Sequence, residues 1–167
     1  MILHILRHGT AEDAPPAGGD DGARRLTASG REKVRAAAEG IRALGLKFDA
    51  ILTSPLPRAA ETAELVAAAY ANSSAPEVLT ALTAGVSPAE TVAALKQYER
   101  YERLVIVGHE PGLSGVASLL LTGSATGVNF DLKKCGMITL ELPEGFARGS
   151  AQLRWMLSPR HLRRLRK

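Results

Sequence analysis

The chain has 167 residues, a length that suits one domain and is short for two. Hydrophobic residues make up 46% and charged residues 23%, with a net charge of +4, a globular mixture that excludes disordered, collagen-like and coiled-coil proteins. The single cysteine, Cys135, excludes an intrachain disulfide framework and a cysteine-rich zinc site, which suits the reducing cytoplasm.

The chain opens on a short apolar segment, residues 2–6, followed by an Arg-His-Gly tripeptide at residues 7–9. No basic flank precedes this segment, so we expect a buried strand that meets a turn and not a signal peptide. Residues 10–25 are rich in turn-forming residues and have no periodicity, which predicts a loop. The longest apolar run, residues 116–121, is far shorter than the ~20 residues of a membrane span.

Helix signals follow this loop. Thr27 or Ser29 can cap a first helix, whose apolar residues recur at helical spacing until Gly45 stops it. A short strand is expected at residues 49–53. Beyond it, an alanine-rich stretch that begins with proline predicts a helix over residues 58–70.

The second half of the chain alternates further strands and helices. An S-x-x-E capping box at residues 87–90 opens a helix that runs to about residue 98. Residues 104–107 form the clearest buried strand, because they are an unbroken run of apolar residues that ends at a glycine. The remaining expected elements are a short strand at 78–79, a helix at 113–121 and strands at 137–142 and 151–156.

The alternation of strands and helices predicts a three-layer α/β/α sandwich with a mainly parallel central sheet. In such folds the functional side chains gather just outside the carboxyl ends of the strands. Arg7 and His8 follow the first strand. Ser54 and Arg58 follow the second strand, and His109 follows the clearest buried strand. Three strand ends therefore deliver cationic or imidazole side chains to one edge of the sheet.

This set of side chains is suited to an anion. The fork of an arginine matches two phosphate oxygens and keeps its charge, and helix N-termini near Pro57 and Pro111 would add backbone donors. Neighbouring arginines should lower the pKa of His8 below its ordinary ~6.5. A neutral imidazole can attack phosphorus and carry the phosphoryl group as a covalent intermediate.

A metal centre is the alternative for a pair of histidines. Zinc takes three or four protein ligands and hard metals take carboxylates, whereas the neighbours here are arginines, which repel a divalent cation. We therefore expect no metal and no other cofactor. His4, His161 and Cys135 lack this context, and we expect them to be structural or solvent-exposed.

Three segments together resemble the motifs of a known family. Residues 7–10 read R-H-G-T, residues 54–63 read S-P-L-P-R-A-A-E-T-A, and residues 107–111 read V-G-H-E-P. In this order, and at strand ends, they resemble the motifs of the histidine phosphatase superfamily, whose fold is phosphoglycerate-mutase-like. The resemblance extends over nearly the whole chain.

The resemblance implies that His8 is the nucleophile. Arg7, Arg58 and His109 would then hold the phosphoryl oxygens and stabilise the charge that is transferred. Larger members of the family supply a glutamate proton donor after the third strand, but residues 79–85 contain no acid. We therefore expect poor cleavage of alkoxide leaving groups. Possible weak donors elsewhere are Glu12, Asp13 and Glu110.

The missing acid indicates a branch of the family. Residues 24–27 resemble the R-x-L-T segment of the short SixA-type phosphohistidine phosphatases, which implies that Arg24 is an additional phosphate contact. Residues 155–159 resemble the C-terminal strand of that branch. The brief segment between Tyr70 and Leu104 has no room for the helical cap of mutases, so an open pocket is expected.

These features predict a metal-independent phosphatase that forms a phosphohistidine intermediate on His8 and acts on phosphohistidine in a protein. A small-molecule phosphomonoesterase of the same family and a non-catalytic phosphate-binding module are the alternatives.

The last eight residues carry five of the 21 basic residues, and the chain before them has 16 basic and 17 acidic residues. We expect one domain over residues 1–159 and a frayed, solvent-exposed basic tail over residues 160–167. Such a tail could contact nucleic acid or acidic lipid, but no groove-reading motif accompanies it, and we expect neither partner.

Overall fold

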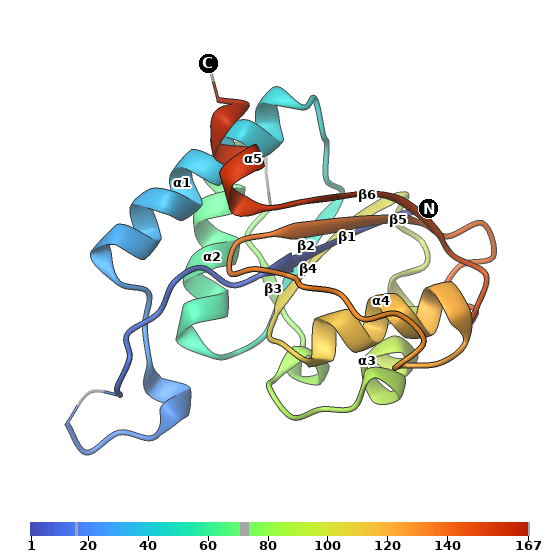
Figure 1. Ribbon diagram of the computed structural model, residues 1–167, viewed down its shortest axis with the longest axis horizontal. Helices are drawn as coiled ribbons and strands as arrows, with labels where there is room; N and C mark the ends of the chain where they lie inside the picture. Colours follow the sequence, from blue (N-terminus) through green and yellow to red (C-terminus); the bar gives the residue numbers. More distant parts are fainter. Residues whose placement is uncertain (16, 71–73, 167) are drawn as a thin grey trace.

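The computed structural model describes residues 1–15, 17–70 and 74–166, and Figure 1 shows a central sheet with helices on both faces. The strands are β1 (Ile2–Arg7), β2 (Ala50–Thr53), β3 (Glu77–Val78), β4 (Arg103–Gly108), β5 (Met137–Glu141) and β6 (Gln152–Leu157). They form one sheet in the order β3-β2-β4-β1-β5-β6. The pairs β3/β2, β2/β4 and β4/β1 are parallel, whereas β1/β5 and β5/β6 are antiparallel.

The helices cover both faces of this sheet, which confirms the predicted three-layer sandwich. The α-helices of the described residues are α1 (Ala28–Ala43), α2 (Pro57–Ala67), α3 (Pro88–Leu95), α4 (Gly112–Thr122) and α5 (Pro159–Arg164). Short 3-10 helices lie at η1 (Asp21–Ala23), η2 (Thr80–Leu82) and η3 (Lys96–Tyr98). Within the described part of the chain, no helix is both long enough and apolar enough to cross a membrane.

Two hydrophobic cores fix the central strands between the helix layers. Leu3 and Ile5 of β1 pack with α3 and α4, whereas Leu6 packs with α1, α2 and α5. The successive side chains of β1 and β4 are therefore buried on both faces. This explains why both strands are continuous apolar runs in the sequence, as is typical of a parallel sheet covered on both sides.

Most element boundaries lie close to those expected, and the differences have local causes. Thr27 caps α1, since its hydroxyl accepts a hydrogen bond from the Gly30 amide at 2.9 Å, and Ser29 lies inside the helix. The second helix ends at Ala67, three residues before the expected end. The expected loop at residues 10–25 contains η1, capped by the side chain of Asp20.

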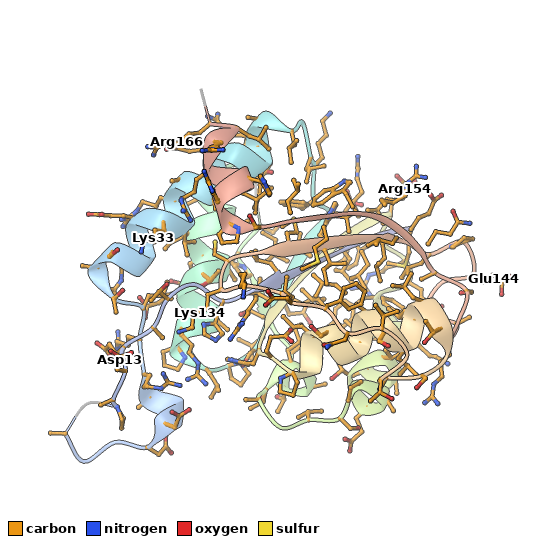
Figure 2. The ribbon with its side chains drawn as sticks, viewed as in Figure 1. Asp13, Lys33, Lys134, Glu144, Arg154 and Arg166 are labelled. Atoms are coloured by element: carbon orange, nitrogen blue, oxygen red, sulfur yellow. The ribbon has the colours of Figure 1, made fainter. Side chains whose placement is uncertain are left out.

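The C-terminal residues form a helix where a frayed tail was expected, so this expectation is wrong for α5. Leu162 is fully buried in the core that α5 shares with α1 and α2. A glycine in α1 allows the close approach, because a Cβ atom at Gly40 would lie 1.8 Å from the Leu162 carbonyl oxygen. The basic side chains of this segment remain at the surface, as Figure 2 shows for Arg166.

We expect the docking of α5 to contribute measurably to stability. The Leu162→Ala variant should lose about 2–5 kcal/mol of unfolding free energy in urea, the usual cost of truncating a buried leucine. Leu165→Ala, at a position that is 38% exposed, is the matched control and should change it little. Equal effects of the two substitutions would show that α5 does not pack on α1 in solution.

Candidate active site

The carboxyl ends of three parallel strands meet at one edge of the sheet and begin the site. The ladder continues just beyond the strands, because the His8 amide donates to the Gly108 carbonyl at 3.1 Å. On the other side of β4, the Ser54 amide donates to the Val107 carbonyl at 3.0 Å. His8 and Ser54 are thus fixed by backbone hydrogen bonds to β4, and His109 follows the last residue of β4 directly, as its place in the sequence predicts.

The ring of His8 is held in one tautomer. Its Nδ1 lies 2.7 Å from the Gly9 carbonyl oxygen, which can only accept, so Nδ1 carries the proton and Nε2 keeps its lone pair. The Gly9 amide donates to the hydroxyl of Thr62 at 3.0 Å, and that hydroxyl donates to the Arg58 carbonyl at 2.7 Å. A Cβ atom at Gly9 would lie 2.5 Å from Val34, so the turn after His8 requires glycine.

The ring of His109 lies beside that of His8, tilted by 50°, with ring centroids 5.1 Å apart. Its Nε2 lies 2.8 Å from the hydroxyl oxygen of Ser54, and that oxygen already accepts from the Leu56 amide. We infer that the Ser54 hydroxyl donates to Nε2, which leaves the proton on Nδ1. Nδ1 is buried and has no hydrogen-bond partner, so its N–H is available to an oxygen of a bound anion.

Arg7 and Arg58 approach this pair from two elements. Nη1 of Arg7 donates to the Leu132 carbonyl at 2.9 Å, and Nη1 of Arg58 donates to the Asp21 carbonyl at 3.0 Å. The Nε atoms of both guanidinium groups are buried without a partner. Each arginine is therefore anchored at one end of its fork and has an unpaired donor at the other. This arrangement suits an oxyanion.

The loop before β5 completes the floor of the site. The amide of Cys135 lies 3.0 Å from the carbonyl oxygens of both Arg7 and His8. The neighbouring Lys134, labelled in Figure 2, is exposed. Burial raises the pKa of the Cys135 thiol to about 12, so this side chain packs and is not a thiolate nucleophile.

Arg24 lies at the rim of the site and is joined to Arg58 through one carboxylate. The side chain of Asp21 pairs with Arg24 at 2.8 Å and with Arg58 at 3.6 Å. Arg24 also donates to the Glu12 carbonyl at 2.8 Å. Arg24 thus lies outside the buried pair of histidines, and its contact with phosphate, which the resemblance implies, stays a prediction.

Burial and positive charge keep both histidines neutral. Burial, with smaller contributions from His109, Arg58 and Arg7, lowers the pKa of His8 from 6.5 to about 3, although the Gly9 hydrogen bond opposes it. Burial, with Arg58, Arg7 and Arg24, lowers the pKa of His109 to about 4. These electrostatic interactions also show that the structure brings together the five residues predicted for the site, which are Arg7, His8, Arg24, Arg58 and His109. Their catalytic roles stay predictions.

Two residues of the site were not assigned a role from the sequence. Thr62 lies inside the quoted S-P-x-x-R-A-x-x-T-A segment, but its position between Gly9 and Arg58 depends on the packing of α2. Asp21 lies in the loop for which the sequence predicts no structure. Its D-x-x-R spacing to Arg24, typical of a helical turn, was the available signal.

Two of the three predicted weak acids accept hydrogen bonds from backbone amides. Glu12 accepts a hydrogen bond from the Arg25 amide at 3.1 Å, and Glu110 accepts one from the Ser114 amide at 3.1 Å. Asp13 is exposed.

Across residues 1–15, 17–70 and 74–166, no group of three histidine, cysteine, aspartate or glutamate side chains could hold a metal ion.

The remaining histidines have other environments. The ring of His4 lies 2.8 Å from the Thr139 hydroxyl and packs against Phe48 and Trp155, and burial lowers its pKa to about 4. His161 is exposed on α5. Both therefore have the structural or solvated character that the sequence predicts.

An open groove of about 630 Å³ lies beside the site, between the start of α4, the segment before α3 and the segment after α4. Val86 and Phe130 contribute to its apolar lining, and Glu110, which follows His109 in the chain, lies at its edge. A small cavity lined by His109 and Glu110 adjoins it. The segment between α2 and β4 places α3 against α4, as Figure 1 shows.

The comparisons with known proteins agree with this geometry. The family model for the histidine phosphatase superfamily (branch 1) matches residues 3–84. An uncharacterised protein of Picosynechococcus sp. is 39% identical over 142 residues, which cover 84% of each chain. The chain therefore belongs to the histidine phosphatase superfamily.

Within this family, the chain is similar to phosphohistidine phosphatases. Phosphohistidine phosphatase SixA of Escherichia coli (strain K12) is 27% identical over 169 residues, 98% of this chain and 97% of that protein. The structure of the protein histidine phosphatase SixA complexed with tungstate matches with a TM-score of 0.83, 26% identity and coverage of 97% and 99%. The α-ribazole phosphatase of Shigella flexneri shares the fold, with a TM-score of 0.75, 20% identity and coverage of 95% and 97%.

The low pKa of His8 leads to a prediction about acid pH. The neutral ring is the reactive form, and its folded pKa of about 3 lies below the ordinary 6.5. We therefore expect kcat/KM, corrected for protonation of the substrate phosphate, to stay level as the pH falls through about 6.5. Titration of the His8 ring by NMR checks the same point. A kinetic group near the ordinary histidine value that matches an NMR titration of the His8 ring would contradict it.

The anchored arginines predict a graded series of variants. Arg58→Ala and Arg7→Ala should each lower kcat/KM for an aryl phosphate by roughly 10²–10³, the effect of removing one oxyanion donor. Arg24→Ala, at the rim, should cost less. Arg25→Ala removes a neighbouring exposed cation and serves as the control. Equal losses for Arg24→Ala and Arg58→Ala would place Arg24 inside the phosphate site.

Proposed function

We propose that this protein is a metal-independent phosphatase that forms a covalent intermediate on His8 and removes phosphoryl groups from phosphohistidine in proteins. The observation that carries the proposal is the state of His8. Its Nδ1 proton is held by Gly9, and its low pKa keeps the Nε2 lone pair free beside His109 and the arginines.

The residues divide the reaction between them. Nε2 of His8 attacks phosphorus while the bond from phosphorus to the leaving nitrogen or oxygen breaks, and the electron pair of that bond goes to the leaving atom. Arg7, Arg58 and Nδ1–H of His109 hold the phosphoryl oxygens. Water then attacks phosphorus, the bond to His8 breaks, and inorganic phosphate and neutral His8 result. In these roles the two arginines stay positively charged and the ring of His109 stays neutral. None of the roles needs a metal ion.

Three features support phosphohistidine as the substrate. The chain is similar over nearly its whole length to SixA proteins described as phosphohistidine phosphatases. The groove beside His109 offers an apolar surface next to the phosphate site for the protein that carries the phosphorylated side chain. Residues 79–85 contain no acid, so the site favours a substrate whose leaving group is already protonated.

A small-molecule phosphomonoesterase is the second candidate. The observation in its favour is the fold shared with an α-ribazole phosphatase and, at a TM-score of 0.67 and 19% identity, with a phosphoserine phosphatase of Entamoeba histolytica. At these identities the likeness concerns the fold alone. A non-catalytic phosphate-binding module is the third candidate, but the free Nε2 of His8 makes it less suited to this site.

The proposal predicts both an intermediate and a substrate order. Rapid alkaline quench of wild type with labelled substrate should trap phosphate on His8, and His8→Ala should lose essentially all turnover. Phosphohistidine peptide should give a higher kcat/KM than p-nitrophenyl phosphate, and both should exceed sugar phosphates. EDTA should leave these rates unchanged.

His161→Ala is the matched control, since it removes an exposed histidine outside the site. Full turnover in His8→Ala would refute the covalent mechanism. A sugar phosphate with the highest kcat/KM would favour the small-molecule phosphatase. Binding of phosphate without turnover of any substrate would favour the binding module.

A further inference from the structure

We propose that Asp21 selects phosphohistidine by accepting a hydrogen bond from the distal N–H of its imidazole ring while that ring leaves. The inference rests on the proposed function and adds to it a residue that recognises the leaving group. Neither the motifs of the sequence nor the comparisons assign a role to this carboxylate.

The Asp21 carboxylate contacts the arginines proposed to bind the phosphoryl group. Its two oxygens contact Arg24 at 2.8 and 3.3 Å, and one of them lies 3.6 Å from Arg58. The Asp21 carbonyl anchors the same arginine at 3.0 Å. The side chain is nevertheless 72% exposed, whereas that of Arg58 is 5% exposed. The acid therefore stands on the solvent side of the phosphate-binding arginines, the side from which a protein substrate approaches.

This carboxylate is an acceptor and not a proton donor. Arg24, with help from Arg58, lowers the pKa of the Asp21 carboxyl below its ordinary value. It is thus ionised at neutral pH and cannot protonate a departing alkoxide. It can instead bind a group that already carries a proton and positive charge, since hydrogen bonds to an ionised acceptor are the strong ones.

The leaving group of phosphohistidine has this character. When the nitrogen distal to phosphorus is protonated, the P–N bond breaks with its electron pair on the proximal nitrogen, and a neutral imidazole departs with its distal N–H intact. No proton has to be transferred. Carboxylate contact with the distal N–H stabilises the reactive, protonated ring, and charge is then transferred from the substrate imidazole to His8.

The attacking imidazole, His8, also has an oxygen that accepts from its distal N–H. Nδ1–H of His8 donates to the Gly9 carbonyl at 2.7 Å, so the accepting imidazole has its distal proton fixed by an oxygen. Phosphoryl transfer between two imidazoles is chemically symmetric and needs an acceptor for each distal N–H. Asp21 supplies the second acceptor. Aryl and sugar phosphates have no such N–H and gain nothing from it.

The nearby acids are less suited to this role. Asp20 accepts from the Ala23 amide, Glu12 from the Arg25 amide and Glu110 from the Ser114 amide. Each of these carboxylates is used to fix a turn or the start of a helix, and none of them forms an ion pair with Arg58. Asp21 is the acid that shares a charged contact with the phosphate-binding arginines.

The test compares two substrates in wild type, Asp21→Asn and Asp13→Asn. Phosphoimidazole has the distal N–H and p-nitrophenyl phosphate lacks it. We expect the ratio of kcat/KM for phosphoimidazole to that for p-nitrophenyl phosphate to fall about 10- to 100-fold in Asp21→Asn, the range of a hydrogen bond to a charged group. Asp13→Asn removes an equal charge from the same exposed loop and should leave the ratio unchanged.

The remaining outcomes count against the inference. Parallel losses on both substrates would make Asp21 a positioning residue for Arg58, and parallel gains would mean that it only blocks the arginines. An equal fall of the ratio in Asp13→Asn would reduce the effect to overall charge. The proposed function fails separately, if wild type itself does not prefer phosphohistidine peptide to p-nitrophenyl phosphate. Turnover of p-nitrophenyl phosphate also reports whether Asp21→Asn has folded.

Discussion

The last carbonyl groups of β4 accept backbone hydrogen bonds from both neighbouring strands, and the geometry of the site follows from these contacts. Gly108 receives the amide of His8, and Val107 receives the amide of Ser54. In a sheet, a slip of one residue moves a side chain by about 3.3 Å and turns it to the opposite face. The distance between the two histidine rings is therefore fixed by strand register, which is set by the apolar cores on both faces.

The fold buries the guanidinium groups of the site and leaves some of their N–H donors without a hydrogen-bond partner. Arg58 is 4% exposed and has one free donor, although Asp21 partly neutralises it. Desolvating such a group is costly when the protein folds, and a bound anion recovers part of that cost. Because the donors are already oriented and dry, little reorganisation is needed when charge develops on the transferred group. The neutral state of His8 has the same origin, since burial and neighbouring cations act on its pKa in one direction.

The order of the elements and the site residues near strand ends could be predicted from the sequence, because both depend on local signals. Unbroken apolar runs mark the buried strands, Arg7 and His8 lie at the end of β1, and His109 directly follows β4. Arg58 lies in the first turn of the helix after β2. The features that the sequence did not predict depend on distant contacts. Leu162 looks like one apolar residue in a basic tail, and only the space beside Gly40 shows where it packs. The carboxylate of Asp21 meets Arg58 across 37 positions of the chain, a contact that no local pattern encodes.

The position of β1 at the centre of the sheet has a consequence for synthesis of the chain. Its two partners, β4 and β5, begin at Arg103 and Met137, although β1 itself begins at Ile2. The first strand to leave the ribosome thus lacks both neighbours until β4 and β5 have emerged, and His8 gains its Gly108 contact only when more than half of the chain has been made. Until then, an apolar strand with two open edges is exposed, the situation in which nascent chains aggregate. The interval in which β1 has open edges therefore ends with the same strand pairings that bring His8 to Gly108.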